Sequence, residues 1–250
     1  MRAHGVLRVG YLQDSLPYAF VNGRDELVGF DIEMAYIMAG DLNLALELVP
    51  VSRRILDAGL DAAVCDLVMS GVMVTTNRAA QITLSPSYLD ETLAFVVPDH
   101  SRESFSSWQT IRDKGRLRIG VPALPYYAEK VRQELPEAEI VSFESTDEVF
   151  VQAKMTFDAV MLTAERGSAW TLLHPQYSVA VPKPRLVRVP LVYPIAGHDE
   201  AFGKFVAAWI ELKRKDGTID ALFAHWILGR NDAAKAPRWS VARDLLHWVS

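Results

Sequence analysis

The chain has 250 residues, half of them hydrophobic, and a formal net charge of −5. This length can bury one large core or two modest ones. The acidic balance, without a run of lysine or arginine, argues against a nucleic-acid partner. The apolar runs are only as long as strands, so we expect no membrane-spanning segment. Cys65 is the single cysteine, which excludes an internal disulfide and a thiolate metal cage, and we expect it to be an inert core residue.

The first residues leave no room for a secretion signal. Met1–Gly5 lead directly into the strand-like segment Val6–Tyr11, with no apolar stretch between them. We therefore expect either a cytoplasmic protein, or a mature form or excised domain that lacks its leader.

The first part of the chain alternates strand and helix patterns. Val6–Tyr11 alternates as a strand does, and the loop after it, Gln13–Pro17, is of the kind that lines the ligand crevice in open α/β sheets. Asn22–Asp25 is a turn, and the pattern predicts a helix from Phe30 to about Leu42. Further strands are predicted at Leu44–Val49 and Asp66–Ser70, and a short helix at Ile55–Leu60. This order predicts a largely parallel, doubly wound sheet.

A second run of the same kind follows. The apolar segment Thr92–Pro98 gives way to the polar loop Asp99–Ser107, which indicates a crossing between two lobes. Leu117–Val121 then mirrors Leu7–Tyr11. Later helices are predicted at Tyr126–Glu134, Thr146–Lys154, Ala164–Leu173, Ala201–Lys213 and Ile219–Trp226, and strands at Glu139–Phe143 and Phe157–Leu162. The extended run Leu186–Ile195 carries the chain back.

Two similar α/β lobes joined by two extended crossings predict a clamshell. Each lobe is expected to hold a doubly wound, mostly parallel sheet, and the two crossings form the hinge. We assign residues 1–96 and 190–229 to lobe 1, residues 97–189 to lobe 2, and residues 230–250 to a C-terminal linker and amphipathic helix. A cleft between the lobes is the default place for a small ligand.

The stretch from Leu67 to Arg78 has the features of a carboxylate site. Gly71 allows the backbone to pass close to a ligand or another segment. Thr75 is suited to cap a short helix, which brings Arg78 near unpaired backbone N–H groups. A guanidinium binds both oxygens of a carboxylate at once. The alternative is that Arg78 pairs with an acid on the surface.

Four short motifs in a fixed order carry a family resemblance. They are Pro17-Tyr18-Ala19-Phe20, Gly29-Phe30-Asp31, Ser70–Arg78 and Asp216-Gly217-Thr218-Ile219-Asp220. With them the chain resembles, over roughly residues 6–229, the family 3 extracellular solute-binding proteins. These are polar amino-acid receptors of ABC importers with the type II periplasmic-binding fold. The resemblance implies a periplasmic or extracytoplasmic monomer without cofactor, metal or catalytic residue, which delivers a small carboxylate ligand to a membrane transporter.

The resemblance also assigns site residues. It places the ligand's α-carboxylate on Arg78, in agreement with the residue chemistry, and backbone contacts on Ser70, Gly71 and Met73. The family usually has Ser or Thr at the last position, so Met73 replaces a hydroxyl by an apolar wall. The remaining candidate ligand-binding residues are Asp14, Ser15, Val72, Tyr126, Tyr127, Thr163 and Glu165.

The second lobe departs from the family pattern in two places. Tyr126 and Tyr127 stand where a Gly-Thr-Thr-like loop is usual, and they either cover an apolar part of the ligand or pack against their own helix. Thr163 stands where an acid usually pairs with the ligand's ammonium, and either Asp14 or Glu165 must replace that acid if an ammonium binds. We therefore expect organic acids, or amino acids with bulky apolar bodies, rather than glutamine, arginine, lysine or histidine.

Two other functions fit this fold. Cyclohexadienyl dehydratases resemble the binding proteins, and Glu165 or Glu91 would supply a general acid. A ligand-sensing domain of a membrane receptor is the other alternative. The six histidines show no spacing typical of metal ligands.

The end of the chain allows two arrangements. Trp239, Ala242, Leu246 and Val249 share one helical face, which either docks onto a lobe or contacts a membrane surface. The ending also resembles receptor domains fused to dicarboxylate:cation symporters. A fused symporter would make this chain the membrane-tethered receptor of a larger protein.

Overall fold

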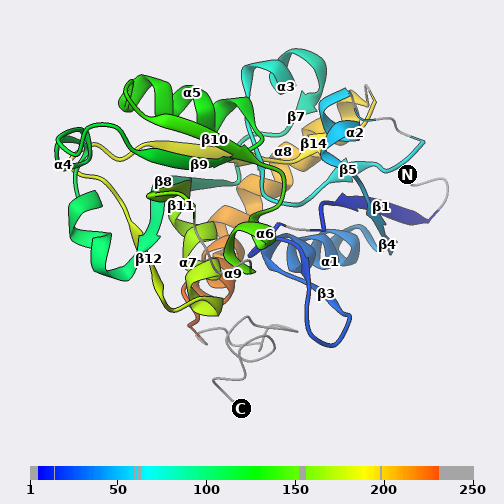
Figure 1. Ribbon diagram of the computed structural model, residues 1–250. Helices are drawn as coiled ribbons and strands as arrows, with labels where there is room; N and C mark the ends of the chain where they lie inside the picture. The colour runs from blue at the N-terminus through cyan, green and yellow to red at the C-terminus, as the bar shows by residue number, and fades with distance from the viewer. Residues whose placement is uncertain are drawn as a thin grey trace. The chain divides into compact units, whose positions relative to one another are not determined.

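The computed structural model describes residues 5–13, 15–58, 60, 63–151, 156–197 and 199–230. The chain divides into two compact units (Figure 1): unit 1 is drawn from residues 1–90 and 190–250, and unit 2 from residues 91–189. The second crossing therefore lies at 189/190, while the first lies at 90/91 rather than 96/97. The reason is that strand β8 (Leu89–Pro98) pairs with strands of unit 2 along residues 93–98. The predicted C-terminal helix lies outside the described residues.

Unit 1 is built on a five-stranded sheet in the order β4-β1-β5-β14-β7. Its strands are β1 (Val6–Tyr11), β4 (Ala45–Pro50), β5 (Leu67–Val68), β14 (Pro194–Ile195) and β7 (Thr83–Leu84). The first three run parallel to one another, as the strand–helix alternation predicts, and β14 runs antiparallel to both of its neighbours, β5 and β7. Beneath the sheet, Cys65 is fully buried in an apolar cluster, and burial raises the pKa of its thiol to about 11. Its expected role as an inert core residue is confirmed.

The helices of unit 1 follow from local signals. Helix α1 (Phe30–Leu42) begins after Gly29 and ends at Asn43 in the left-handed conformation. The short hairpin β2 (Phe20–Val21) and β3 (Leu27–Val28) encloses the predicted turn. The remaining helices are α2 (Arg53–Ala58), α3 (Thr76–Gln81), α8 (Glu200–Lys215) and α9 (Thr218–Trp226).

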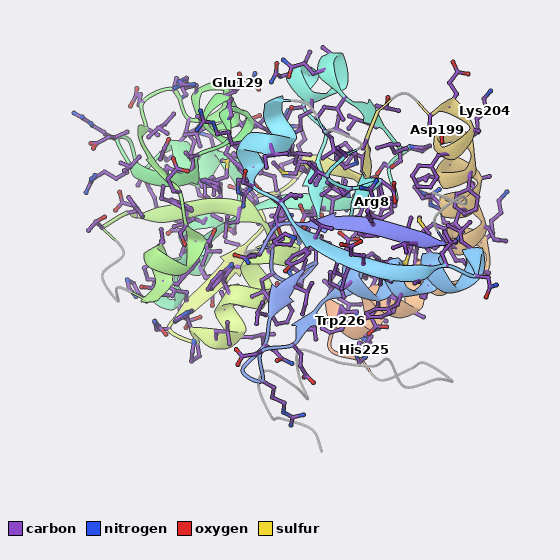
Figure 2. All side chains as sticks on the ribbon, turned by 90° about the vertical axis from the view of Figure 1, so that its right-hand side faces the viewer. Arg8, Glu129, Asp199, Lys204, His225 and Trp226 are labelled. Carbon is purple, nitrogen blue, oxygen red and sulfur yellow. The ribbon has the colours of Figure 1, made fainter. Side chains whose placement is uncertain are left out.

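Helices α8 and α9 close unit 1. Figure 2 shows Asp199 and Lys204 at the first turns of α8, and His225 beside Trp226 on α9. The Asp199 side chain caps α8 by accepting the N–H of Phe202 at 2.9 Å. His225 is buried, as expected of a structural histidine, and meets the Trp226 ring edge-on. No helix among the described residues is both long and apolar enough to span a membrane.

Unit 2 holds the strands β10-β9-β11-β8, and β12 pairs with β8. Their bounds are Glu139–Phe143 for β10, Arg118–Pro122 for β9, Ala159–Thr163 for β11 and Tyr177–Ala180 for β12. The pairs β10–β9 and β9–β11 are parallel, and the pairs that β8 makes with β11 and with β12 are antiparallel. Helices α5 (Pro125–Glu134), α6 (Thr146–Val151) and α7 (Ala164–Leu173) connect them. The predicted α/β class is confirmed in both units.

One sequence prediction fails in the crossing regions. The polar loop predicted at Asp99–Ser107 is a 3₁₀ helix, Asp99–Phe105, followed by helix α4 (Trp108–Arg112) with a reciprocal Ser107–Thr110 cap. The extended run predicted at Leu186–Ile195 contains two strands, β13 (Arg188–Val192) and β14. Tyr193 lies between them, and its N–H donates to the hydroxyl of Ser85 at 2.8 Å.

The entry to α1 depends on a glycine. Gly29 has φ 137°, and a Cβ at this position would lie 2.3 Å from the Tyr18 carbonyl oxygen. We expect Gly29→Ala to lower the free energy of unfolding by about 2 kcal/mol or more, since both the backbone conformation and the contact are unfavourable.

Gly23 provides the matched control. It lies in the turn between β2 and β3, and a Cβ there meets nothing within 4 Å. Gly23→Ala should change the free energy by no more than about 0.5 kcal/mol in denaturant melts. Equal midpoints for the two variants would contradict the role assigned to Gly29.

Candidate functional site

The segment from Ser70 to Arg78 turns sharply after strand β5, contains one further short strand, and enters helix α3, which is capped. After β5, Gly71 adopts φ 60°, and β6 (Val72–Met73) pairs antiparallel with the end of β13. The Thr75 hydroxyl then caps α3 by accepting the N–H of Arg78 at 3.2 Å. The predicted cap is therefore confirmed. We call residues 70–78 the binding turn.

Arg78 is held inside the binding turn. Its side chain is 4% exposed, and Nη1 donates to the carbonyl oxygen of Met73 at 3.1 Å. The Arg78 side chain is therefore buried and does not extend over the surface. A guanidinium has five N–H donors in a rigid fork, and the Met73 bond fixes the direction of that fork.

Ser70 and Gly71 make internal contacts with their polar groups. The Ser70 hydroxyl accepts the N–H of Leu12 at 3.0 Å and donates to the Leu12 carbonyl at 3.2 Å, which ties the binding turn to the end of β1. The Gly71 N–H donates to Oδ2 of Asp31 at 2.5 Å. The role of both residues toward a ligand stays a prediction. Val72 and Met73 have buried side chains, so Met73 is apolar and enclosed, as its type predicts.

The loop after β1 is partly described. Ser15 is buried, its N–H donates to the Ala19 carbonyl at 3.0 Å, and its own carbonyl accepts the N–H groups of Tyr18 and Ala19. Ser15 thus shapes a tight loop, and its role toward a ligand stays a prediction. Asp14 lies outside the described residues.

Asp31 is the residue of unit 1 that sequence reasoning missed. It is fully buried at the start of α1 and accepts three hydrogen bonds, from the Gly71 N–H and from the hydroxyls of Tyr88 and Tyr193. The sequence did contain a signal, because Asp31 stands between the apolar residues Phe30 and Ile32 in the first turn of the helix. An acid in that position requires buried donors.

In unit 2, Thr163 belongs to a buried polar cluster. Its hydroxyl donates to Oε1 of Glu91 at 2.9 Å, and Glu91, fully buried, pairs with the guanidinium of Arg166 at 3.2 Å. The Thr163 side chain also caps α7. Thr163 therefore contacts an acid of its own unit, Glu91. This acid lies beside the position at which the family usually has an acid that pairs with the ligand's ammonium.

Glu165 lies in the first turn of α7. Its Oε2 accepts the N–H of Thr92 at 2.9 Å. Burial, and then the negative charge of Glu91, raise the pKa of Glu165 to about 7. The side chain thus takes up and releases a proton near neutral pH, which is a property of acids that act in binding or catalysis.

The two tyrosines of α5 differ. Tyr127 is 2% exposed, which favours the interpretation that it packs within unit 2. Tyr126 is half-buried, meets the Tyr127 ring edge-on at 5.7 Å, and lies 5.8 Å from Nζ of Lys130. Of the pair, Tyr126 is the better candidate for a ligand contact. Pro125 occupies the first turn of the helix, where its missing N–H costs no hydrogen bond.

The described part of the chain brings the candidates together in two groups. The binding turn and the β1 loop converge in unit 1, and Thr163 and Glu165 lie together at the β11–α7 junction of unit 2. Among these described residues no cluster of three or more His, Cys, Asp or Glu side chains could hold a metal ion.

Comparisons with known proteins place the chain in a family. Residues 7–229 match the model of the bacterial extracellular solute-binding proteins, family 3. Cyclohexadienyl dehydratase of Pseudomonas aeruginosa is 25% identical over 89% of this chain and 83% of its own. ABC transporter arginine-binding protein 1 of Escherichia coli is 22% identical over 84% and 86%.

The solved structures agree. The crystal structure of the ancestral amino acid-binding protein AncCDT-1, a precursor of cyclohexadienyl dehydratase, has a TM-score of 0.75 and 25% identity, and the match covers 89% of this chain and 95% of that one. The predicted type II periplasmic-binding fold is thereby confirmed. With a family match that extends from β1 to the end of α9, the chain belongs to the bacterial extracellular solute-binding proteins, family 3.

Proposed function

We propose that this protein is a solute-binding receptor that closes on a small carboxylate-bearing ligand and delivers it to a membrane transporter. The observation that carries the proposal is the buried guanidinium of Arg78, fixed by the Met73 carbonyl on a capped turn. A cation prepared in this way matches a carboxylate in charge and geometry. The family and the arginine-binding relative support a ligand of the amino-acid class and a location outside the cytoplasm.

The proposed ligand has an apolar or weakly polar body. Met73 offers the ligand no hydroxyl, and the hydroxyl of Thr163 is bonded to Glu91. Glu165 has a pKa of about 7, so at neutral pH it is only partly charged and is a weak partner for an ammonium. An ammonium that leaves water without an anionic partner is costly. These losses favour organic acids or amino acids with bulky apolar side chains.

A dehydratase-like enzyme is the second candidate. Cyclohexadienyl dehydratase is among the relatives, and Glu165 has the raised pKa that a general acid needs at neutral pH. Glu91, the other acid of this cluster, forms an ion pair with Arg166. The receptor remains our proposal because a receptor needs only the fold and the binding turn. An enzyme would in addition need a general acid placed next to the leaving group of its substrate.

The first prediction concerns Arg78. Arg78→Ala should weaken binding of a carboxylate ligand by about 2–5 kcal/mol, because it leaves a buried carboxylate without its partner. Arg78→Lys should also bind poorly, because an ammonium does not reproduce the planar fork. Titration calorimetry measures both, with Arg24→Ala, an exposed arginine of the β2–β3 turn, as the control. A folded Arg78→Ala protein with native affinity would exclude this assignment.

The second prediction concerns ligand choice. In a calorimetric panel, phenylpyruvate and L-phenylalanine should bind with affinities within about tenfold of each other, and more tightly than L-arginine or L-glutamine. Binding should be saturable and one to one. If L-arginine binds most tightly and Glu165→Gln abolishes it, the ligand argument is wrong while the receptor stands. Multiple turnovers of prephenate or arogenate would instead establish the enzyme.

The third prediction concerns the pH dependence of stability. The pKa of Glu165 rises from 4.5 to about 7 on folding, so the folded state holds a proton that the unfolded state has released. Stability from this group is therefore fully present below pH 4.5 and is lost as the pH rises through 7. Glu165→Gln keeps the acceptor for the Thr92 N–H without the charge.

The measurement compares thermal midpoints between pH 5 and pH 8. The wild-type midpoint should fall more over this range than that of Glu165→Gln. Glu129→Gln, a substitution of an exposed acid on α5 (labelled in Figure 2), serves as the control and should follow the wild type. Parallel curves for the wild type and Glu165→Gln would show that the Glu165 carboxyl has an ordinary pKa.

A further inference from the structure

Three segments of unit 1, far apart in the sequence, meet at the carboxylate of Asp31. Oδ2 accepts the Gly71 N–H at 2.5 Å and the Tyr88 hydroxyl at 2.7 Å, and Oδ1 accepts the Tyr193 hydroxyl at 3.0 Å. The two tyrosine rings stack with their centroids 4.1 Å apart. Asp31 and both tyrosines are at most 1% exposed, so this arrangement is sealed from solvent.

The partners of Asp31 have distinct places in the chain. Gly71 belongs to the binding turn. Tyr88 lies just before the chain leaves unit 1 at 90/91, and Tyr193 lies just after it returns at 189/190. The carboxylate of Asp31 therefore holds the binding turn, which carries Arg78, and also one residue beside each of the two crossings. We call the segments around these crossings, residues 86–91 and 189–193, the hinge strands.

Backbone bonds connect the same three segments. Val74 donates its N–H to the Pro190 carbonyl at 3.1 Å, and Tyr88 donates its N–H to the Leu191 carbonyl at 3.0 Å. Leu191 in turn pairs with Met73. A displacement of the binding turn is thus transmitted to the returning strand, and from there to the residues that precede the first crossing.

Packing alone does not explain an acid at this position. A buried carboxylate is costly even when its partners are good, and an apolar residue of similar size is often as stabilising. The charge does, however, strengthen each of the three bonds and specifies one geometry. Burial, and then the charge of Asp31, raise the pKa of both tyrosines well above the usual range, so their hydroxyls stay protonated and continue to donate.

We propose that Asp31 is a positioning residue that fixes the binding turn against both hinge strands and so couples ligand binding on the turn to movement of the hinge. This inference rests on the proposed receptor function. Asp31 itself does not contact the ligand in this arrangement, because its carboxylate is enclosed by donors from its own unit.

The test uses Asp31→Asn in the full chain. An amide of the same shape has one acceptor oxygen instead of two, so it cannot accept all three hydrogen bonds. We expect the affinity for phenylpyruvate or L-phenylalanine to fall about 3- to 30-fold, measured at a temperature where the variant is fully folded. Tyr88→Phe and Tyr193→Phe each remove one hinge bond and should give smaller losses.

Met38→Ala separates positioning from stability. Met38 is fully buried on the same helix, outside the Asp31 contacts, and its truncation should lower the unfolding free energy by about 2–5 kcal/mol. Its ligand affinity should stay within about twofold of the wild type. A similar loss of affinity in both variants would show that Asp31 acts only as a core residue. Native affinity in Asp31→Asn would overturn the inference.

Hydrogen exchange of the ligand-free protein gives a second measurement. In Asp31→Asn, protection should fall in three places together, at residues 71–74, 86–91 and 189–193, and Met38→Ala should not reproduce this pattern. If the wild type binds none of the acids in the calorimetric panel, the proposed function is wrong. The hydrogen-exchange pattern then tests the positioning role of Asp31 by itself. Loss of protection at the binding turn without loss at the hinge strands would contradict the coupling.

Discussion

The need of a buried carboxylate for hydrogen-bond donors determines how the segments around Asp31 are arranged in unit 1. Asp31 cannot be buried unless N–H and O–H groups surround it, and the chain supplies them from a glycine amide and two tyrosines. Meeting this need brings the start of α1, the binding turn and the two hinge strands to one point. The position of Arg78 follows from it, since Arg78 is bonded to the turn that begins at Gly71.

Unit 2 shows the same principle with a different solution. Glu91 is fully buried directly after the first crossing, and its carboxylate is bound by Arg166 of α7 and by Thr163, the last residue of β11. Glu165, next to them, accepts the N–H of Thr92, and burial raises the pKa of its carboxyl to about 7. The receptor and dehydratase interpretations of the fold assign different roles to this carboxyl.

Local patterns predicted the elements of this fold well. Val6–Tyr11, Glu139–Phe143 and Ala164–Leu173 have the predicted bounds, because alternation and helical periodicity are properties of a single segment. The cap that places Arg78 was also visible in four consecutive residues. The Gly-Phe-Asp motif identified the family, yet it did not indicate what the acid does. That role requires Tyr193, which is 162 residues away, and no local pattern reports such a pairing.

The first crossing is anchored on both sides of a very short segment. Tyr88 is held by Asp31 in unit 1, and Glu91 is held by Arg166 and Thr163 in unit 2. Between these anchors lie only Leu89 and Asp90. Asp90 is the exposed one of these two residues. If the proposed receptor closes by a rotation at this crossing, the backbone dihedrals of Leu89 and Asp90 are the ones that can change while both anchors stay intact.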